Sequence, residues 1–231
     1  MAEAGKRGSI VAKDVRDGKG ATLAVILAGG AARRMGGADK ATILLAGRPL
    51  LAHVMARLAP QVAAMVVSAN GDPGRFAAFG LPVLADPVAN RPGPLAGILA
   101  ALLWTRTHRP EIADILVAPV DTPFLPDDLR ARLDQARRTA GRPLAIAASA
   151  GRRHPTVALM PVAAALASDL AARLARGERR VGAFFSAHGA AIADYGEGQP
   201  NPFRNLNTRD DLADADAEAA PDRPSGSLLA R

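Results

Sequence analysis

The sequence predicts an α/β protein: a single three-layer α/β/α domain around a Rossmann-like, mainly parallel sheet. Short apolar runs of strand length alternate with segments in which apolar residues recur at helical spacing. The links between them are short, and no repeat or linker divides the chain. With 231 residues, 49% of them hydrophobic, the chain can bury one substantial core, which we place in residues 21–219.

The first two thirds of the chain follow the order β-α-β-β-α-β-α, which is typical of a parallel sheet covered on both faces. Apolar runs predict strands at residues 23–27, 64–68, 82–85 and 115–120. Helical spacing predicts three helices. The first carries Leu50, Leu51, Val54 and Leu58 and stops at Pro60, the second carries Leu95, Ile98, Leu99, Leu102 and Leu103 on its apolar face, and the third opens at residues 126–128.

The last third is less regular. Strands are expected at 144–148 and 156–160, joined by a basic turn at 151–154, with a helix at 162–175 and a further strand near 190–195. Thr208-Arg209-Asp210-Asp211 resembles a capping box and starts a last helix. The polar ends are predicted to be a disordered N-terminal extension (1–20) and a flexible tail (220–231).

The composition excludes several classes of function. Aromatic residues make up 3% of the chain, too few for base stacking along nucleic acid, and the absence of cysteine excludes thiolate chemistry. No apolar run approaches the roughly 20 residues that span a bilayer, and the N-terminal segment lacks the apolar core of a signal peptide. We therefore expect a cytoplasmic protein that binds neither nucleic acid nor membrane, and whose net charge of +7 suits an anionic small substrate.

A glycine-rich loop leaves the first predicted strand. It contains Gly29, Gly30, Gly36 and Gly37 together with Arg33, Arg34 and Lys40. Glycines allow close approach of the backbone, and amide, guanidinium and ammonium groups together form a cradle for a polyphosphate. The spacing is neither that of a Walker A loop nor that of a dinucleotide-binding Gly-x-Gly-x-x-Gly. We expect one of the two arginines to face the cradle, although Lys40 could equally be an ordinary surface lysine.

Two aspartates follow predicted strands, Asp86 and Asp121. In open α/β sheets ligands bind beyond the carboxyl ends of the strands, the edge from which the glycine-rich loop also departs. Either aspartate alone could simply start a turn or cap a helix. Beside a phosphate loop, however, Asp121 becomes a candidate ligand for Mg²⁺, which takes one or two carboxylates plus phosphate oxygens.

Three further polar groups are candidates. Asn205 and Asn207 flank one apolar residue, so an extended chain would place both amides on the same side, although a plain loop before a helix is the simpler interpretation. Residues 177–180 could form an anion clamp or a solvated helix end. Nothing in the sequence pairs His154 with a nucleophile or a second metal ligand.

These residues together resemble a known family. The loop Leu27-Ala28-Gly29-Gly30 with Arg34, Met35, Gly36 and Lys40 is similar to the signature of nucleotidyltransferases with a nucleoside-diphospho-sugar transferase-like fold. The ordered set resembles, more narrowly, the MobA-type molybdenum cofactor guanylyltransferases. That set continues with Gly47-Arg48-Pro49-Leu50, Pro92-Gly93-Pro94-Leu95-Ala96-Gly97, Asp121-Thr122-Pro123, His154-Pro155-Thr156, Gly177-Glu178-Arg179-Arg180 and Asn205-Leu206-Asn207-Thr208.

The resemblance implies Mg²⁺-dependent transfer of GMP from GTP to the phosphate of molybdopterin, with release of pyrophosphate. Arg34, Lys40 and Asp121 would be the catalytic residues, with Asp121 also holding the metal. GTP would contact Leu27, Ala28, Gly29, Gly30, Lys40, Ser68, Asn70, Asp86 and Asp121. The pterin would face Arg179, Arg180, Asn205 and Asn207. Ser68-Ala69-Asn70 departs from the Asn-Ala-Asn often found in the family, which leaves the guanine contact of Ser68 open, with Asn70 as a substitute.

Three alternatives remain at this level. The loop binds phosphates rather than a base, so cytidylyl transfer to the same pterin or nucleotidyl transfer to a sugar phosphate is compatible with it. A nucleotide-dependent carrier of the molybdenum cofactor is the non-enzymatic alternative. A monomer is expected, with molybdoenzymes or cofactor-insertion chaperones as protein partners.

Overall fold

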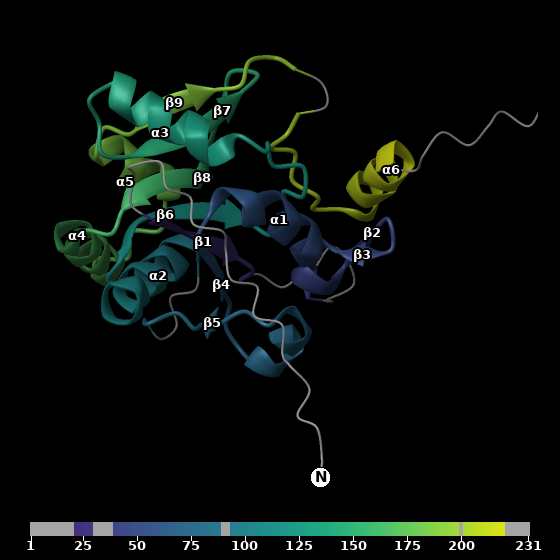
Figure 1. Cartoon of the computed structure of the whole chain (residues 1–231), viewed down its shortest axis with the longest axis horizontal. Coiled ribbons are helices and arrows are strands. Elements are labelled where there is room, and N and C mark those ends of the chain that lie inside the picture. The colour runs from purple at the N-terminus through teal and green to yellow at the C-terminus, as the bar shows by residue number, and fades with distance from the viewer. Residues whose placement is uncertain (1–20, 30–38, 89–92, 199–200, 220–231) are drawn as a thin grey trace, which may run out of the picture.

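A computed structural model describes residues 21–29, 39–88, 93–198 and 201–219. Within these ranges a seven-stranded sheet has the order β5-β4-β1-β6-β8-β7-β9, which Figure 1 shows from β5 near the bottom to β9 near the top. Helices cover both faces, so the predicted three-layer α/β/α architecture is confirmed. The predicted extension 1–20, the tail 220–231 and residues 30–38 of the glycine-rich loop lie outside the described ranges.

The sheet is mainly parallel. Its strands are β1 (Ala21–Leu27), β4 (Ala64–Ser68), β5 (Val83–Leu84), β6 (Ile112–Pro119), β7 (Ala145–Ser149), β8 (Arg152–Pro161) and β9 (Ala191–Asp194). β1 lies between β4 and β6 and runs parallel to both. Only β8 is reversed among these strands, since it is antiparallel to both β6 and β7. Therefore β8 begins at the edge where the other strands end.

Side chains of β1 alternate between two apolar layers. Leu23, Val25 and Leu27 belong to the layer that contains α2 (Pro94–His108), α4 (Ala164–Ala175) and α5 (Val181–Ala187). Ala24 and Ile26 face the opposite layer, made by α1 (Leu50–Leu58), α3 (Leu129–Thr139) and the 3-10 segment η4 (Pro73–Phe79). A strand buried on both faces has a continuous apolar sequence, and this is why β1 could be predicted so clearly from the sequence.

A third, smaller cluster joins segments that are far apart in the chain. Leu45, Leu50, Leu206 and Ala215 are buried together. They bring the hairpin β2 (Leu44–Leu45) and β3 (Arg48–Pro49) against α6 (Arg209–Ala219), on the right of Figure 1. This cluster holds the segment before α6 against the β2–β3 hairpin and the first residue of α1.

The predicted elements are confirmed with small shifts. Strand 64–68 and the end of the first helix at Leu58 agree with the structure, where the 3-10 turn η3 (Ala59–Gln61) follows. The prediction that Leu103 belongs to the apolar face of α2 was wrong, because this side chain is 41% exposed. The basic segment predicted as a turn is also different, because Arg152–His154 already belong to β8 and pair with β7. The hairpin β2–β3 and the 3-10 segments η2 (Lys40–Thr42) and η4 were not predicted.

Helix α2 approaches the sheet unusually closely at Gly97. A Cβ added there would stand 2.3 Å from Ser68 Oγ and 3.0 Å from Leu27 Cδ2, both below normal contact. The helix can therefore lie this near the ends of β1 and β4 only because position 97 has no side chain.

Gly97→Ala should lower the free energy of unfolding by about 1 kcal/mol, because overpacking costs about 1–3 kcal/mol and the better helix propensity of alanine returns roughly 1 kcal/mol. Urea unfolding followed by circular dichroism measures the change. Gly182→Ala is the matched control, since a Cβ there meets Pro155 only at 3.9 Å. The double variant Ser68→Ala/Gly97→Ala should regain part of the loss. Equal stability of Gly97→Ala and the wild type would contradict the close approach.

Candidate active site

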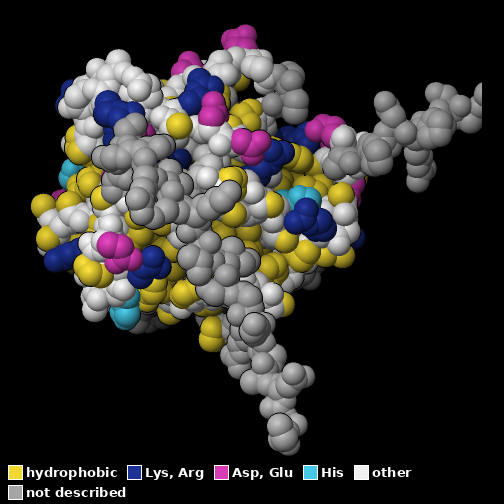
Figure 2. Space-filling model, viewed as in Figure 1, with side chains coloured by type: hydrophobic (Ala, Val, Ile, Leu, Met, Phe, Trp, Pro, Cys, Tyr) yellow, Lys and Arg dark blue, Asp and Glu magenta, His cyan; other side chains and the backbone are white. Residues whose placement is uncertain are grey.

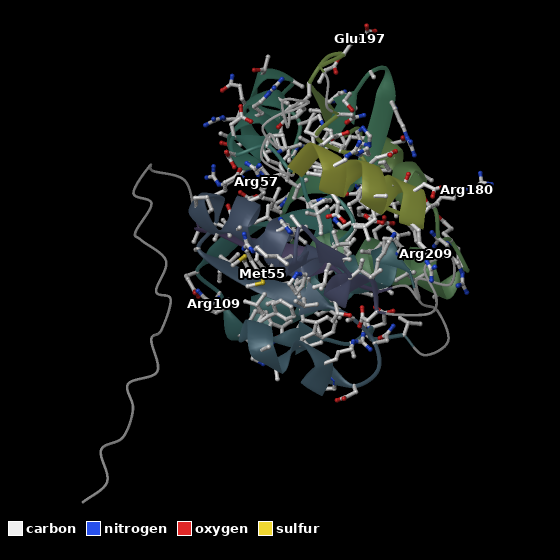
Figure 3. All side chains as sticks on the ribbon, turned by 90° about the vertical axis from the view of Figure 1, so that its right-hand side faces the viewer. Met55, Arg57, Arg109, Arg180, Glu197 and Arg209 are labelled. Carbon is white, nitrogen blue, oxygen red and sulfur yellow. The ribbon has the colours of Figure 1, made fainter. Side chains whose placement is uncertain are left out.

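The ends of four neighbouring strands form one edge. Gly29 follows β1, Asn70 follows β4, Asp86 follows β5 and Asp121 follows β6. Main-chain bonds extend the pairing beyond the strands: Ala28 N donates to Ser68 O at 2.9 Å, and Val120 N donates to Leu27 O at 3.0 Å. Because these strands are parallel, all four predicted positions reach the same carboxyl edge. Figure 3 shows the molecule from the side that carries α6.

Lys40 and Asp121 form the centre of the site. Lys40 Nζ lies 2.5 Å from Asp121 Oδ2 and also donates to Asn207 Oδ1. The two charged side chains are 16% and 14% exposed, so water screens the pair only in part. Asp39 caps η2 by accepting from Ala41 N at 3.1 Å, which sets the direction in which Lys40 leaves the loop. The alternative of a free surface lysine is thereby ruled out, and so is a helix-capping role for Asp121 in the described part of the chain.

The two asparagines approach the same strand end. Asn205 Oδ1 accepts from Thr122 Oγ1 at 3.3 Å, while Asn207 accepts from Lys40. Between them, Leu206 is fully buried and its N–H donates to the main-chain oxygen of Asp121 at 2.9 Å. Both amides therefore lie on one side of the chain, as the spacing predicted, and the segment is more than a plain loop.

The capping box before α6 secures this segment. Thr208 Oγ1 accepts from Asp211 N at 3.0 Å, and Asp211 Oδ2 accepts from the backbone amides of Asn207 and Thr208, both at 2.8 Å. The hydrogen bond from the Asn207 amide and those made with Thr208 lower the pKa of Asp211 below its ordinary value. The carboxylate thus fixes the backbone of a predicted site residue.

A second polar group lies over β4 and β5. Asn70 Nδ2 donates to Asp86 Oδ2 at 2.7 Å, and Asp86 N donates back to Asn70 Oδ1 at 2.9 Å. Arg75 donates to the Asn70 carbonyl at 2.7 Å, and its Nε lies 2.6 Å from Asp39 Oδ2. Arg75 therefore ties this group to the residue beside Lys40. Sequence reasoning missed it, because nothing in the local pattern of η4 points back to Asp39.

Ser68 occupies a different environment from Asn70. Ser68 is 3% exposed, beneath Gly97 of α2, whereas Asn70 is exposed. A ligand at this edge can therefore reach the Asn70 amide more readily than the Ser68 hydroxyl, which fits the proposed substitution of one for the other.

Not every predicted residue joins the centre. Arg179 and Arg180 are exposed between α4 and α5, and neither forms an ion pair with a described residue. In Figure 3 Arg180 projects outward from the side of the molecule. Glu178 instead binds Arg173 and Arg176, at 3.0 and 3.1 Å. Gly30, Arg33 and Arg34 lie outside the described residues, whereas Leu27, Ala28 and Gly29 lie where β1 ends.

The site suits a cation that arrives with its own ligands. Among the described residues no group of three or more His, Asp or Glu side chains gathers to hold a metal. Mg²⁺ needs only one or two carboxylates when phosphate oxygens and water complete its shell. Asp121, partly exposed at the edge and next to the asparagine amide oxygens, fits that requirement.

Basic side chains do not gather into one patch on the face drawn in Figure 2. On the face shown in Figure 2, Lys and Arg side chains are scattered among apolar and acidic ones. No helix in the described part of the chain is both long and apolar enough to cross a bilayer.

The fold, the phosphate-type loop and the polar edge together define the class of nucleotide-binding α/β proteins that act at the carboxyl ends of a parallel sheet. The family profile described as "MobA-like NTP transferase domain" matches residues 24–192, so the chain belongs to this nucleotidyltransferase family.

Relatives agree over most of the chain. A molybdenum cofactor guanylyltransferase from Rhodopseudomonas palustris (strain BisB5) is 52% identical over 203 residues, which are 87% of this chain and 96% of that protein. A protein of the same name from Cereibacter sphaeroides is 52% identical over 194 residues, covering 84% and 94%. The family resemblance predicted from the sequence is confirmed.

Solved structures show the same fold at low identity. The molybdopterin-guanine dinucleotide biosynthesis protein A from Archaeoglobus fulgidus superposes with a TM-score of 0.64 at 22% identity, covering 85% of this chain and 97% of that one. A 4-diphosphocytidyl-2C-methyl-D-erythritol synthase from Anaerococcus prevotii gives 0.65 at 12% identity, covering 86% and 96%. These similarities establish the architecture alone.

Asp211 should make the stability of the domain depend on pH in acid. Its pKa in the folded state is lowered, so its contribution is fully present above the unfolded value of about 3.9 and disappears as the pH falls through the folded value. Asp211→Asn should therefore be less stable than the wild type at pH 6, by no more than about 1 kcal/mol because the carboxylate is solvent-screened. The two proteins should converge below about pH 3. Urea unfolding at both pH values measures this, and a difference independent of pH would contradict it.

Proposed function

We propose that this protein transfers GMP from GTP to the phosphate of molybdopterin and releases pyrophosphate. The observation that carries the proposal is the Lys40–Asp121–Asn207 cluster. It lies between the polar group over β4 and β5 and the half of the edge formed by β8, β7 and β9. Membership of the MobA-like family and relatives named molybdenum cofactor guanylyltransferase support this choice of substrates.

The proposed reaction needs positioning and charge neutralisation more than acid–base chemistry. An anionic phosphate oxygen of the acceptor forms a bond to the α-phosphorus of GTP. The bond from that phosphorus to the bridging oxygen breaks, and its electron pair leaves with pyrophosphate. Because the nucleophile is already anionic, no strong general base is required.

Lys40 would supply positive charge where the two polyanions meet. Its ammonium is held by Asp121 and Asn207, so it is oriented before a substrate arrives. Phosphate oxygens would compete for the same ammonium hydrogens. Arg34 would add a second cation to the phosphate cradle.

Asp121 would hold Mg²⁺ together with phosphate oxygens and water. When bound, the ion would neutralise charge that develops on the leaving phosphates. The carboxylate itself would keep its place at the end of β6, since its main-chain oxygen is bonded to Leu206 N.

The two halves of the edge would bind different substrates. Leu27, Ala28, Gly29 and Gly30 would contact the phosphates of GTP, and Ser68, Asn70 and Asp86 would contact its nucleoside. Asn205, Asn207, Arg179 and Arg180 would face the pterin. The two arginines are exposed and form no ion pair with the described residues, which suits an anionic acceptor.

Other features follow from the resemblance. We infer a catalytic domain of residues 21–219 that acts in the cytoplasm as a monomer. Molybdoenzymes or cofactor-insertion chaperones would receive its product. Sedimentation of the full chain tests the monomer.

A comparison of nucleotides tests the proposal. Purified protein receives GTP, CTP, ATP or UTP with Mg²⁺, in the presence of molybdopterin, a sugar phosphate or no acceptor, and pyrophosphate is measured. We expect release with GTP only when the pterin is present. Release with CTP would favour cytidylyl transfer, and release with a sugar phosphate as acceptor would favour the corresponding transferase. Binding without turnover of any nucleotide would favour a carrier.

Asp121→Asn should lower kcat for this transfer by at least about 100-fold, because an electrostatic contact to developing charge is lost while the side chain keeps its shape. Circular dichroism should show an unchanged fold. Asp127→Asn is the matched control: it removes a carboxylate that is 72% exposed and pairs with Arg57. A near-normal rate in Asp121→Asn would overturn the role of Asp121.

A further inference from the structure

Two buried polar side chains and one half-buried one form a hydrogen-bond chain in the acceptor half of the edge. Ser149 ends β7, His154 lies near the start of β8, and Asn201 begins the segment that leads to α6. Ser149 Oγ lies 2.8 Å from His154 Nε2 and 3.0 Å from Asn201 Oδ1. Ser149 is 2% and His154 9% exposed. None of these three residues has a place in the proposed mechanism.

The direction of these bonds follows from the donors available. Asn201 Oδ1 is an acceptor, so the Ser149 hydroxyl donates its only hydrogen to it. The hydroxyl oxygen then accepts from His154 Nε2–H, which assigns the tautomer of the ring. Burial, and to a lesser degree the nearby Arg152, lowers the pKa of His154, in agreement with a neutral ring.

This arrangement does not make a nucleophile and its base. In such a pair the hydroxyl donates to the imidazole, whereas here it donates to an amide oxygen. The serine is also closed off from solvent. The sequence alone indicated no partner for His154. In the structure its partner is Ser149, and the geometry of this bond suits a structural role rather than catalysis.

The hydrogen-bond chain ends at Asn201, the first residue of the segment 201–207. This segment carries Asn205 and Asn207, which we propose to face the acceptor. Asn201 Oδ1 also accepts from Phe203 N at 2.9 Å. The Phe203 ring is 2% exposed and packs against His154, with ring centroids 4.9 Å apart, and against Tyr195 at the same distance. Three residues further on, Leu206 N is bonded to Asp121 O. The segment is therefore fixed at both ends, and Asn205 and Asn207 flank Leu206, the residue that fixes its second end.

We propose that His154, Ser149 and Asn201 are positioning residues for the acceptor: they hold residues 201–207 so that the amides of Asn205 and Asn207 face the end of β6. This inference rests on the proposed function for the identity of the acceptor. The proposed nucleoside contacts are separate from the hydrogen-bond chain, because Asn70, Arg75 and Asp86 are bonded among themselves and to Asp39.

Kinetics with matched variants test the proposal. His154→Leu removes the donor with little change in volume, whereas His154→Gln keeps an N–H donor near the position of Nε2. Ser149→Ala removes the central hydroxyl. Thr105→Val is the control, because Thr105 is also a fully buried hydroxyl but bonds within α2, to Ala101 O. The full chain is assayed for guanylyl transfer with both substrates varied.

The KM for the acceptor should rise about fivefold to tenfold in His154→Leu and Ser149→Ala, as expected for the loss of one hydrogen bond. The KM for GTP should stay within about twofold, since Asp121 still holds Lys40 and the Asn70–Asp86 pair is bonded elsewhere. His154→Gln should recover most of the acceptor KM. A rise in both KM values, an unchanged acceptor KM, or no recovery in His154→Gln would overturn the proposal.

Hydrogen exchange of backbone amides tests the same chain without catalysis. The amides of Phe203 and Leu206 should exchange faster in His154→Leu and Ser149→Ala, and at the wild-type rate in His154→Gln and Thr105→Val. If the wild type shows no guanylyl transfer, the proposed function fails, and this measurement alone decides whether the chain holds the segment. Unchanged exchange at both amides in Ser149→Ala would overturn the proposal whatever the kinetics show.

Discussion

The parallel pairing of β1 with both β4 and β6 is the constraint on which the rest of the structure depends. It places Ala28 against the end of β4 and Leu27 against the residue before Asp121. Both faces of β1 are then covered by helices, so a slip of one residue would move its side chains into the opposite apolar layer and disrupt the packing on both faces. The polar side chains that follow these strands meet at one edge as a consequence of that pairing rather than of any contact among themselves.

Long-range polar bonds then complete the edge. Lys40 and Asp121 are 81 positions apart, and Lys40 and Asn207 are 167 apart. Arg75 links Asp39 to the Asn70–Asp86 pair from a third segment. Such bonds close only after the sheet has formed, so the centre of the site is a product of tertiary folding. The small apolar cluster around Leu206 supplies the packing that holds the most distant of these segments in place.

The sequence predicted best what depends on local pattern. Doubly buried strands such as β1 and β4 read as apolar runs, and the capping box before α6 was recognised from Thr208 and Asp211. Strand ends placed Asp86 and Asp121 at the same edge. The sequence could not reveal Arg75 or the Ser149 partner of His154, because each acts on a residue brought near by the sheet and has no characteristic spacing. The β2–β3 hairpin was missed because two strands of two residues have no periodicity to detect.

The reversal of β8 has a consequence for how such an enzyme can diverge. Because β8 enters the sheet antiparallel, its first residues and the last residues of β7 lie at the same edge as Gly29 and Asp121. In the proposed division of the edge, the nucleotide would be bound by residues before β7 and the acceptor by residues after it. Under that proposal, substitutions after β7 would change the acceptor while the residues that bind the nucleoside triphosphate stay the same. The direction of one strand thus assigns the two proposed substrates to two consecutive parts of the sequence.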